Sequence, residues 1–177
     1  MKRFLSIFII GFCLLYFQAY SVEKMPFKPR WVSILKKGKF FKYKRREFSS
    51  PVIFEDGLYI GTDTGLFYRF NKDGDKVWRI KNGAPINSTA LAIRSGDLVV
   101  VFYGDDEGFL HALNAQDGKE LWQINLGSEI WSAPTFSNSS KAAYVFVSTM
   151  EGKVFCINPI DGHIVWEKRI YLSTSCQ

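Results

Sequence analysis

The chain has 177 residues and a formal net charge of +6, but this charge is unevenly divided. Residues 1–47 hold 12 lysines and arginines against 2 acids, and residues 48–177 hold 11 against 15, so the two parts carry +10 and −4. The larger part is mildly acidic. The basic total therefore does not predict a nucleic-acid-binding domain, and no nucleic-acid partner is expected.

The first 21 residues have the pattern of a secretory signal peptide. Lys2 and Arg3 form a basic end, an apolar stretch runs from Phe4 to Phe17, and residues 19–21 fit a small-x-small cleavage site. A membrane anchor is the alternative, although a spanning helix needs about 20 apolar residues. We therefore expect an exported protein, in the periplasm, the extracellular space or, in a eukaryote, the secretory lumen.

Residues 22–47 form a basic leader. Its positive charges are mixed with Phe40 and Phe41 and lie at Lys36, Lys37, Lys39, Lys42, Lys44, Arg45 and Arg46. Such a segment is either a solvated approach to the next domain or a contact for an anionic surface.

One unit is repeated three times in residues 48–177. The tryptophans recur at an interval of 44 residues (122 − 78 and 166 − 122), at Trp78, Trp122 and Trp166. A glycine precedes each by four positions, at Gly74, Gly118 and Gly162. The period lies in the range of propeller blades and of some helical repeats.

Short strands fill each unit. In the middle unit, β-branched and aromatic runs closed by Gly, Asp or Asn predict strands at 88–93, 98–103, 109–113 and 119–124. The other units repeat this plan, with runs at 57–61, 65–70, 75–80, 144–147, 152–157 and 163–170. No segment has helical periodicity over three turns, and a β-sandwich would not impose a constant period. The sequence therefore predicts four-stranded propeller blades.

The segment from Ala112 to Trp122, Ala-Leu-Asn-Ala-Gln-Asp-Gly-Lys-Glu-Leu-Trp, resembles the tryptophan-docking motif of pyrroloquinoline quinone (PQQ)-like β-propeller repeats. The third unit has Cys156 in place of the alanine, and the first has Tyr68 or Arg69 there. The resemblance implies an all-β, incomplete propeller of about three blades. Trp31, 47 residues before Trp78, is a candidate outer strand of a preceding partial blade. The resemblance to the tryptophan-docking motif implies the following docking residues: Trp78, Trp122, Trp166, Gly74, Gly118, Gly162, Ala112 and Cys156.

Three blades do not close a ring, because closed propellers have about four to eight. PQQ-like rings imply seven or eight. The chain is therefore expected to be a fragment of a longer propeller or to be completed by blades of other chains, since open blade edges invite pairing.

No catalytic, cofactor-binding or metal-binding residue is predicted. The acids at 105–107 are not repeated in the aligned turns, which favours a polar turn over a cation site. His111 takes the position of Tyr68 and Phe155, which indicates packing, and His163 follows a turn and should face solvent. Cys156 should be a buried small residue, and Cys176 a free thiol near the terminus.

The resemblance implies two functions. The first is an exported, non-catalytic module for protein binding or scaffolding without a cofactor, similar to the propeller subunit of the outer-membrane β-barrel assembly machinery. The alternative is a fragment of a PQQ-dependent dehydrogenase. Those enzymes need a complete eight-bladed ring, calcium and a catalytic aspartate, and often have adjacent paired cysteines, whereas this sequence has no Cys-Cys pair.

Overall fold

The computed structural model describes residues 49–139 and 142–170. All of them belong to the second of two compact units, residues 31–177. The predicted signal peptide, the basic leader with Trp31, and Cys176 lie outside the described residues. Within the described ranges there are twelve strands and no helix, so none of these residues forms a helix that could cross a membrane.

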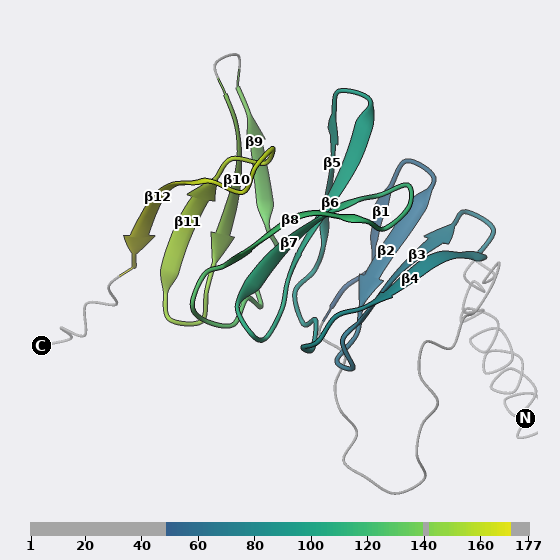
Figure 1. Cartoon of the computed structure of the whole chain (residues 1–177), viewed down its shortest axis with the longest axis horizontal. Coiled ribbons are helices and arrows are strands. Elements are labelled where there is room, and N and C mark those ends of the chain that lie inside the picture. Colours follow the sequence, from purple (N-terminus) through teal and green to yellow (C-terminus); the bar gives the residue numbers. More distant parts are fainter. Residues whose placement is uncertain (1–48, 140–141, 171–177) are drawn as a thin grey trace, which may run out of the picture. The chain divides into compact units, whose positions relative to one another are not determined.

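The strands form three four-stranded antiparallel sheets, which we call blades 1, 2 and 3 (Figure 1). Blade 1 contains β1 (Val52–Phe54), β2 (Gly57–Gly61), β3 (Leu66–Asn71) and β4 (Lys76–Lys81). Blade 2 contains β5 (Leu91–Ser95), β6 (Leu98–Gly104), β7 (Phe109–Asn114) and β8 (Glu120–Asn125). Blade 3 contains β9 (Thr135–Asn138), β10 (Ala143–Ser148), β11 (Lys153–Ile157) and β12 (Ile164–Arg169). The predicted all-β architecture of about three four-stranded blades is confirmed.

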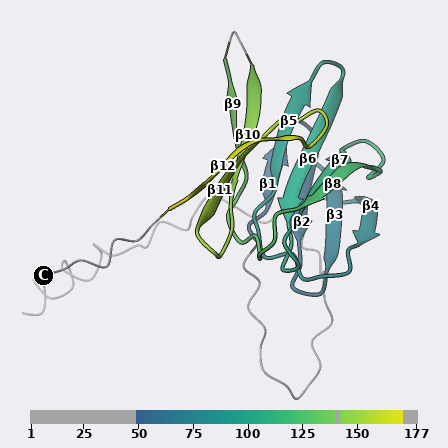
Figure 2. The ribbon, with the colours of Figure 1, turned by 60° about the vertical axis from the view of Figure 1, so that its left-hand side comes forward.

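Within each blade the strands follow chain order, so every connection is a short hairpin. The register shifts at the same place each time: after Arg69 in blade 1, Ala112 in blade 2 and Cys156 in blade 3. The outermost strands β4, β8 and β12 are largely exposed, whereas the middle strands are mostly buried. Figures 1 and 2 show the three sheets standing one after another, each turned relative to the last.

Apolar side chains from neighbouring blades form two cores. Tyr59 and Phe67 of blade 1 meet Val101, Tyr103 and Leu113 of blade 2 in the first core. In the second, blade 2 meets blade 3 through Phe102, Leu110, Val145, Val147 and Phe155. Because each sheet is apolar on two faces, each blade needs a neighbour to keep those faces out of water.

The first strand of blade 2 begins later than predicted. The sequence pattern placed it at 88–93, but β5 spans Leu91–Ser95. The reason is Ser88, which is fully buried and donates its hydroxyl to the carbonyl of Gly104 at 2.8 Å, while the same oxygen accepts the Gly104 N–H at 2.8 Å. Ser132 makes the same pair of bonds with Ser148 one blade later. The serine hydroxyl thus takes the backbone N–H and carbonyl of the neighbouring strand, so these groups are not available for backbone hydrogen bonds at the start of β5 or β9.

Candidate functional site

Trp78 of β4 contacts the following blade rather than its own turn. Its indole N–H donates to the carbonyl of Ala115, in the β7–β8 turn of blade 2, at 2.8 Å. The ring also lies on Gly118 of that turn, where an added Cβ would come within 3.0 Å of Trp78 Cδ2. Gly118 has φ 74°, a left-handed conformation that glycine adopts without strain. The turn therefore supplies both an acceptor and a bare surface for the indole.

Trp122 repeats these contacts one blade later. Its indole N–H donates to the carbonyl of Pro159 at 3.1 Å, and an added Cβ on Gly162 would come within 2.8 Å of the ring. The acceptor lies 37 residues after the donor in both cases (115 − 78 and 159 − 122). The equal intervals in the sequence thus correspond to one contact made twice.

Arg69, and not Tyr68, occupies the alanine position of the motif in blade 1, because Arg69 is the residue paired with Trp78. Its guanidinium donates from Nη1 to the Ala115 carbonyl at 3.0 Å, so this carbonyl accepts from both Trp78 and Arg69. Its Nη2 bonds Asp56 at 3.0 Å. The departure from the motif therefore adds a polar contact between blades 1 and 2. Gly74, the blade 1 counterpart of Gly118, lies half-buried in the β3–β4 turn with φ 88°.

Trp166 stands at the same position in blade 3, but it remains 40 % exposed. It lies on a surface that we call the outward face of blade 3, made of Tyr144, Phe146, Val154, Cys156 and Trp166. These are the positions 44 residues after Val100, Phe102, Leu110, Ala112 and Trp122, of which the first four are at most 5 % exposed beneath blade 3. On the outward face only Cys156 is buried to that degree, at 1 %. An apolar surface that is covered in blade 2 is therefore partly open in blade 3.

Sequence reasoning missed a buried ionic cluster in blade 2. His111 is packed as expected, with its ring stacked on Tyr103 at 4.7 Å between centroids. Its two nitrogens, however, bond Asp105 Oδ2 at 3.1 Å and Glu120 Oε2 at 2.9 Å. Asp105 is 2 % exposed, so it is a buried anchor and not a solvated turn residue.

Cys156 and His163, two other ionisable residues singled out in the sequence, lie apart from this cluster. Burial raises the pKa of the Cys156 thiol, which is free, and His163 is exposed. Within residues 49–139 and 142–170, no group of three histidines, cysteines or acids gathers where it could hold a metal ion.

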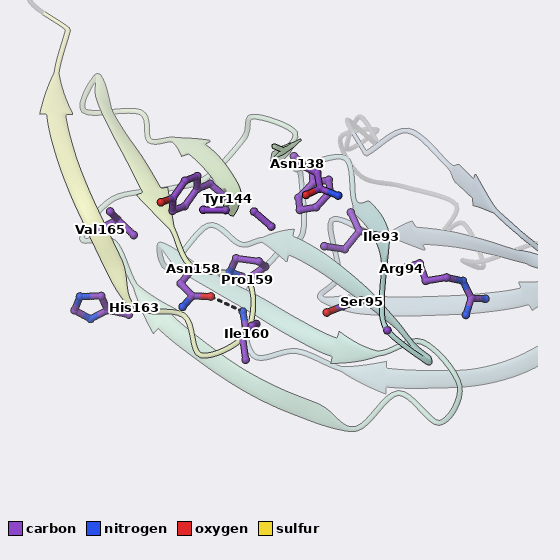
Figure 3. A pocket seen from close by; sticks show the side chains of 14 residues that line it. Ile93, Arg94, Ser95, Asn138, Tyr144, Asn158, Pro159, Ile160, His163 and Val165 are labelled. Carbon is purple, nitrogen blue, oxygen red and sulfur yellow. Dashed lines mark hydrogen bonds between the residues drawn. The ribbon is translucent and has the colours of Figure 1, made fainter. Parts of the chain in front are cut away.

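A pocket of about 570 Å³ lies between blades 2 and 3. The β5–β6 turn, β9, β10 and the β11–β12 turn line it (Figure 3). Its ionisable lining residues are Arg94, which pairs with Glu55 of blade 1, and His163. Asn138 and Asn158 add neutral polar groups, and Asn158 Oδ1 accepts the Ile160 N–H at 3.0 Å. This pocket can offer hydrogen bonds and apolar contact to a ligand.

The family model described as outer membrane protein assembly factor BamB matches residues 110–175. The matched segment, which is 66 of the 177 residues, resembles the PQQ-like repeats of that family. A comparison with curated proteins finds no match. The matched segment contains β8 with Trp122, the turn at Gly162 that this indole contacts, and β12 with Trp166.

Solved structures agree with this assignment of the fold. The crystal structure of BamB from Moraxella catarrhalis superposes with a TM-score of 0.61 at 19 % identity, covering 75 % of this chain and 38 % of that protein. The computationally designed Ika8 protein gives 0.54 at 15 % identity, covering 67 % and 35 %. BBS1N, solved in complex with ARL6DN, gives 0.50 at 19 %, covering 64 % and 33 %. The chain thus spans about a third of each of these proteins, and the fold of stacked four-stranded blades is what it shares with them.

Proposed function

We propose that this PQQ-like chain is an exported, non-catalytic β-propeller module that binds or scaffolds protein and whose blades belong to a longer ring. The observation that carries the proposal is the outward face of blade 3. Trp166 is exposed there and Phe146 and Tyr144 stay partly open, whereas in blade 2 their counterparts Phe102 and Val100 are buried and Trp122 is half-buried. Contiguous exposed apolar surface of this kind marks a place where another protein surface binds.

The shape of the contact is set by the two junctions that are filled. Trp78 and Trp122 each place an indole on a glycine turn and donate to a carbonyl of the next blade. Tryptophan contributes large contact areas, about 150–250 Å² for a buried ring, and is enriched among residues that dominate binding energy. Trp166 offers the same ring in the same setting, with Phe146 beside it at 5.9 Å. A further blade, in a longer chain or in another protein, is the surface that fits it.

The non-catalytic part of the proposal rests on where the ionisable groups lie. In the His111 cluster, His111 and Asp105 are buried, with side-chain exposures of 6 % and 3 %, and Glu120 is 43 % exposed. The pocket between blades 2 and 3 is lined mostly by neutral side chains, and its ionisable lining residues are His163 and Arg94, which pairs with Glu55. The predicted signal peptide supports export, and the likeness to BamB supports a role at or near the bacterial outer membrane.

Replacing Trp166 by glutamate tests this role of the outward face. Purified chain lacking residues 1–21 should enhance the fluorescence of the apolar dye ANS and gain mass with concentration in light scattering. Trp166→Glu should remove most of both effects, because a charge in the middle of the face opposes burial against apolar surface.

Val165→Glu is the matched control. Val165 is the neighbouring residue of β12, it lines the pocket between blades 2 and 3 and not the outward face, and it is 45 % exposed against 40 % for Trp166. The control should behave as the unchanged chain does. Equal behaviour of all three proteins would contradict binding through the outward face, and saturable uptake of PQQ with Ca²⁺ would contradict the non-catalytic role.

A further inference from the structure

The three blades differ at one buried position, and the difference is ionic. In the middle of the third strand blade 1 has Tyr68 and blade 3 has Phe155, whereas blade 2 has His111, which is 4 % exposed. The turn before that strand also departs from the repeat. It has Asp105 where the aligned turns have Thr62 and Thr149. Both departures fall in the same blade, and the two side chains are hydrogen-bonded to each other.

Both nitrogens of the His111 ring face carboxylate oxygens. Nδ1 lies 2.9 Å from Glu120 Oε2, and Nε2 lies 3.1 Å from Asp105 Oδ2. An ionised carboxylate can only accept hydrogen bonds, so both contacts are satisfied only when each ring nitrogen carries a hydrogen. The geometry therefore fits the charged imidazolium form of His111, held between two anions.

Each pKa is set by opposing causes. Burial alone would lower the pKa of His111, but hydrogen bonds to Asp105 and Glu120 outweigh it and raise the pKa above the ordinary 6.5. Burial would raise the pKa of Asp105, but hydrogen bonds from His111, Asn82 and the Phe109 N–H hold it below the ordinary 3.8. Tyr103, the other ionisable group against the ring, has its pKa raised well above the ordinary value by burial and stays neutral.

The cluster also joins two blades. Asp105 Oδ2, which faces His111, accepts a second hydrogen bond at 2.8 Å from Asn82, the residue after β4 of blade 1. Tyr103 is stacked between His111, at 4.7 Å, and Phe67 of blade 1, at 4.3 Å. The backbone N–H of Asp106 donates to Pro85 in the linker between these blades at 3.0 Å. A change of charge at His111 therefore acts on the junction between blades 1 and 2.

We propose that His111 and Asp105 form a pH-responsive latch that holds blade 1 against blade 2. With the proton on His111, the buried carboxylate of Asp105 has a charged partner and fixes Asn82. When His111 loses its proton, one ring nitrogen becomes an acceptor that faces a carboxylate, and Asp105 is left as a buried charge without an opposite charge. Glu120, whose side chain is 43 % exposed, can turn to water, but Asp105 cannot. The junction is then weaker.

The direction of the pH dependence follows from the two pKa shifts. The His111 contribution is complete below about pH 6.5, the ordinary value, and is lost as the pH rises through the raised pKa. The Asp105 contribution is complete above about pH 3.8 and is lost as the pH falls through the lowered pKa. The latch is therefore closed at mildly acidic pH and opens toward alkaline pH. The junction between blades 2 and 3 has Phe155 at this position and is expected to lack this dependence.

The experiment compares the two junctions in one molecule. The amide of Asp106, bonded to Pro85, reports on the first junction, and the amide of Met150, bonded to Glu129 at 2.9 Å, is the corresponding amide at the second. Hydrogen exchange followed by NMR should show the protection of Asp106 falling relative to Met150 as the pH rises. Linkage sets the loss at about tenfold for each unit by which the pKa of His111 exceeds that of an exposed histidine.

The controls are a reference peptide and two variants of the chain. A histidine in a short unstructured peptide, titrated under the same conditions, gives the reference pKa. His111→Phe introduces the residue that blade 3 has at this position. In this variant the ratio of the exchange protection of the Asp106 amide to that of the Met150 amide should not change with pH. Should that variant fail to fold, Glu120→Gln serves instead and should lower the pKa of His111 and move the fall in protection to lower pH. A His111 that titrates with the reference peptide, or a ratio that stays constant in the unchanged chain, would overturn the proposal.

Discussion

Trp122→Ala is expected to lower the free energy of unfolding by about 3–5 kcal/mol, as large-to-small changes of buried aromatic residues do. The indole fills the junction between blades 2 and 3, lies 5.7 Å from Phe102 between ring centroids, and donates to the Pro159 carbonyl. Its removal leaves a cavity against Gly162 and a carbonyl without its donor. Denaturant unfolding of the purified chain measures the change.

Trp166→Ala is the matched control, because it removes the same side chain from the same position of a blade whose outward face is open. Its effect should be clearly smaller, since its indole is already 40 % exposed. Equal losses for the two variants, or a loss below about 0.5 kcal/mol for Trp122→Ala, would mean that Trp122 is not held between blades.

Gly162→Ala is expected to destabilise the chain through two separate effects. Gly162 has φ 75°, and a side chain in this left-handed region costs about 1–2 kcal/mol. An added Cβ would also lie 2.8 Å from Trp122 Cε3, and forcing extra atoms into a packed site costs about another 1–3 kcal/mol. Chemical denaturation gives the sum.

Gly127→Ala separates these effects. Gly127 has φ 87°, but an added Cβ there meets no described atom within 4 Å. It should therefore show the backbone effect alone. If Gly162→Ala were no worse than Gly127→Ala, the contact of the Trp122 ring with the turn would not contribute to stability.

The blade architecture could be predicted because it depends on features that repeat along the sequence. Stacked sheets can be expected from two of these features. Trp78, Trp122 and Trp166 recur at a fixed interval, and a glycine precedes each of them by four positions. The start of β5 could not be predicted from these features. Thr89 and Ala90 fit a strand pattern, but Ser88 binds the backbone of Gly104 and delays the ladder.

The ionic cluster could not be predicted because its members lie six and nine residues apart, and their meeting depends on strand register. His111 pairs with Gln123 across β7 and β8, and only the register shift after Ala112 sets the place of Glu120 beside the ring. A signal was nevertheless present in the sequence. His111 and Asp105 are two departures from the repeat in one unit, and such paired departures indicate contact between the residues. Each alone indicates packing or a polar turn.

The outward face of blade 3 was predictable only in part. The spacing places Trp166 at the docking position, but the extent to which each side chain is covered depends on the neighbouring sheet. Cys156 shows this clearly: it is 1 % exposed although it lies on the same face as Trp166. It is a small residue paired with Phe146 of β10 and Trp166 of β12, two much larger side chains.

Exchange of the indole N–H groups, followed by NMR, tests most directly the central claim that each tryptophan bonds to the next blade. Trp78 and Trp122 should exchange slowly, because their N–H groups donate to Ala115 and Pro159 at 2.8 and 3.1 Å. Trp166, which makes no hydrogen bond to a described residue, should exchange rapidly. Equal rates for all three, or a protected Trp166 beside unprotected Trp78 and Trp122, would contradict the account.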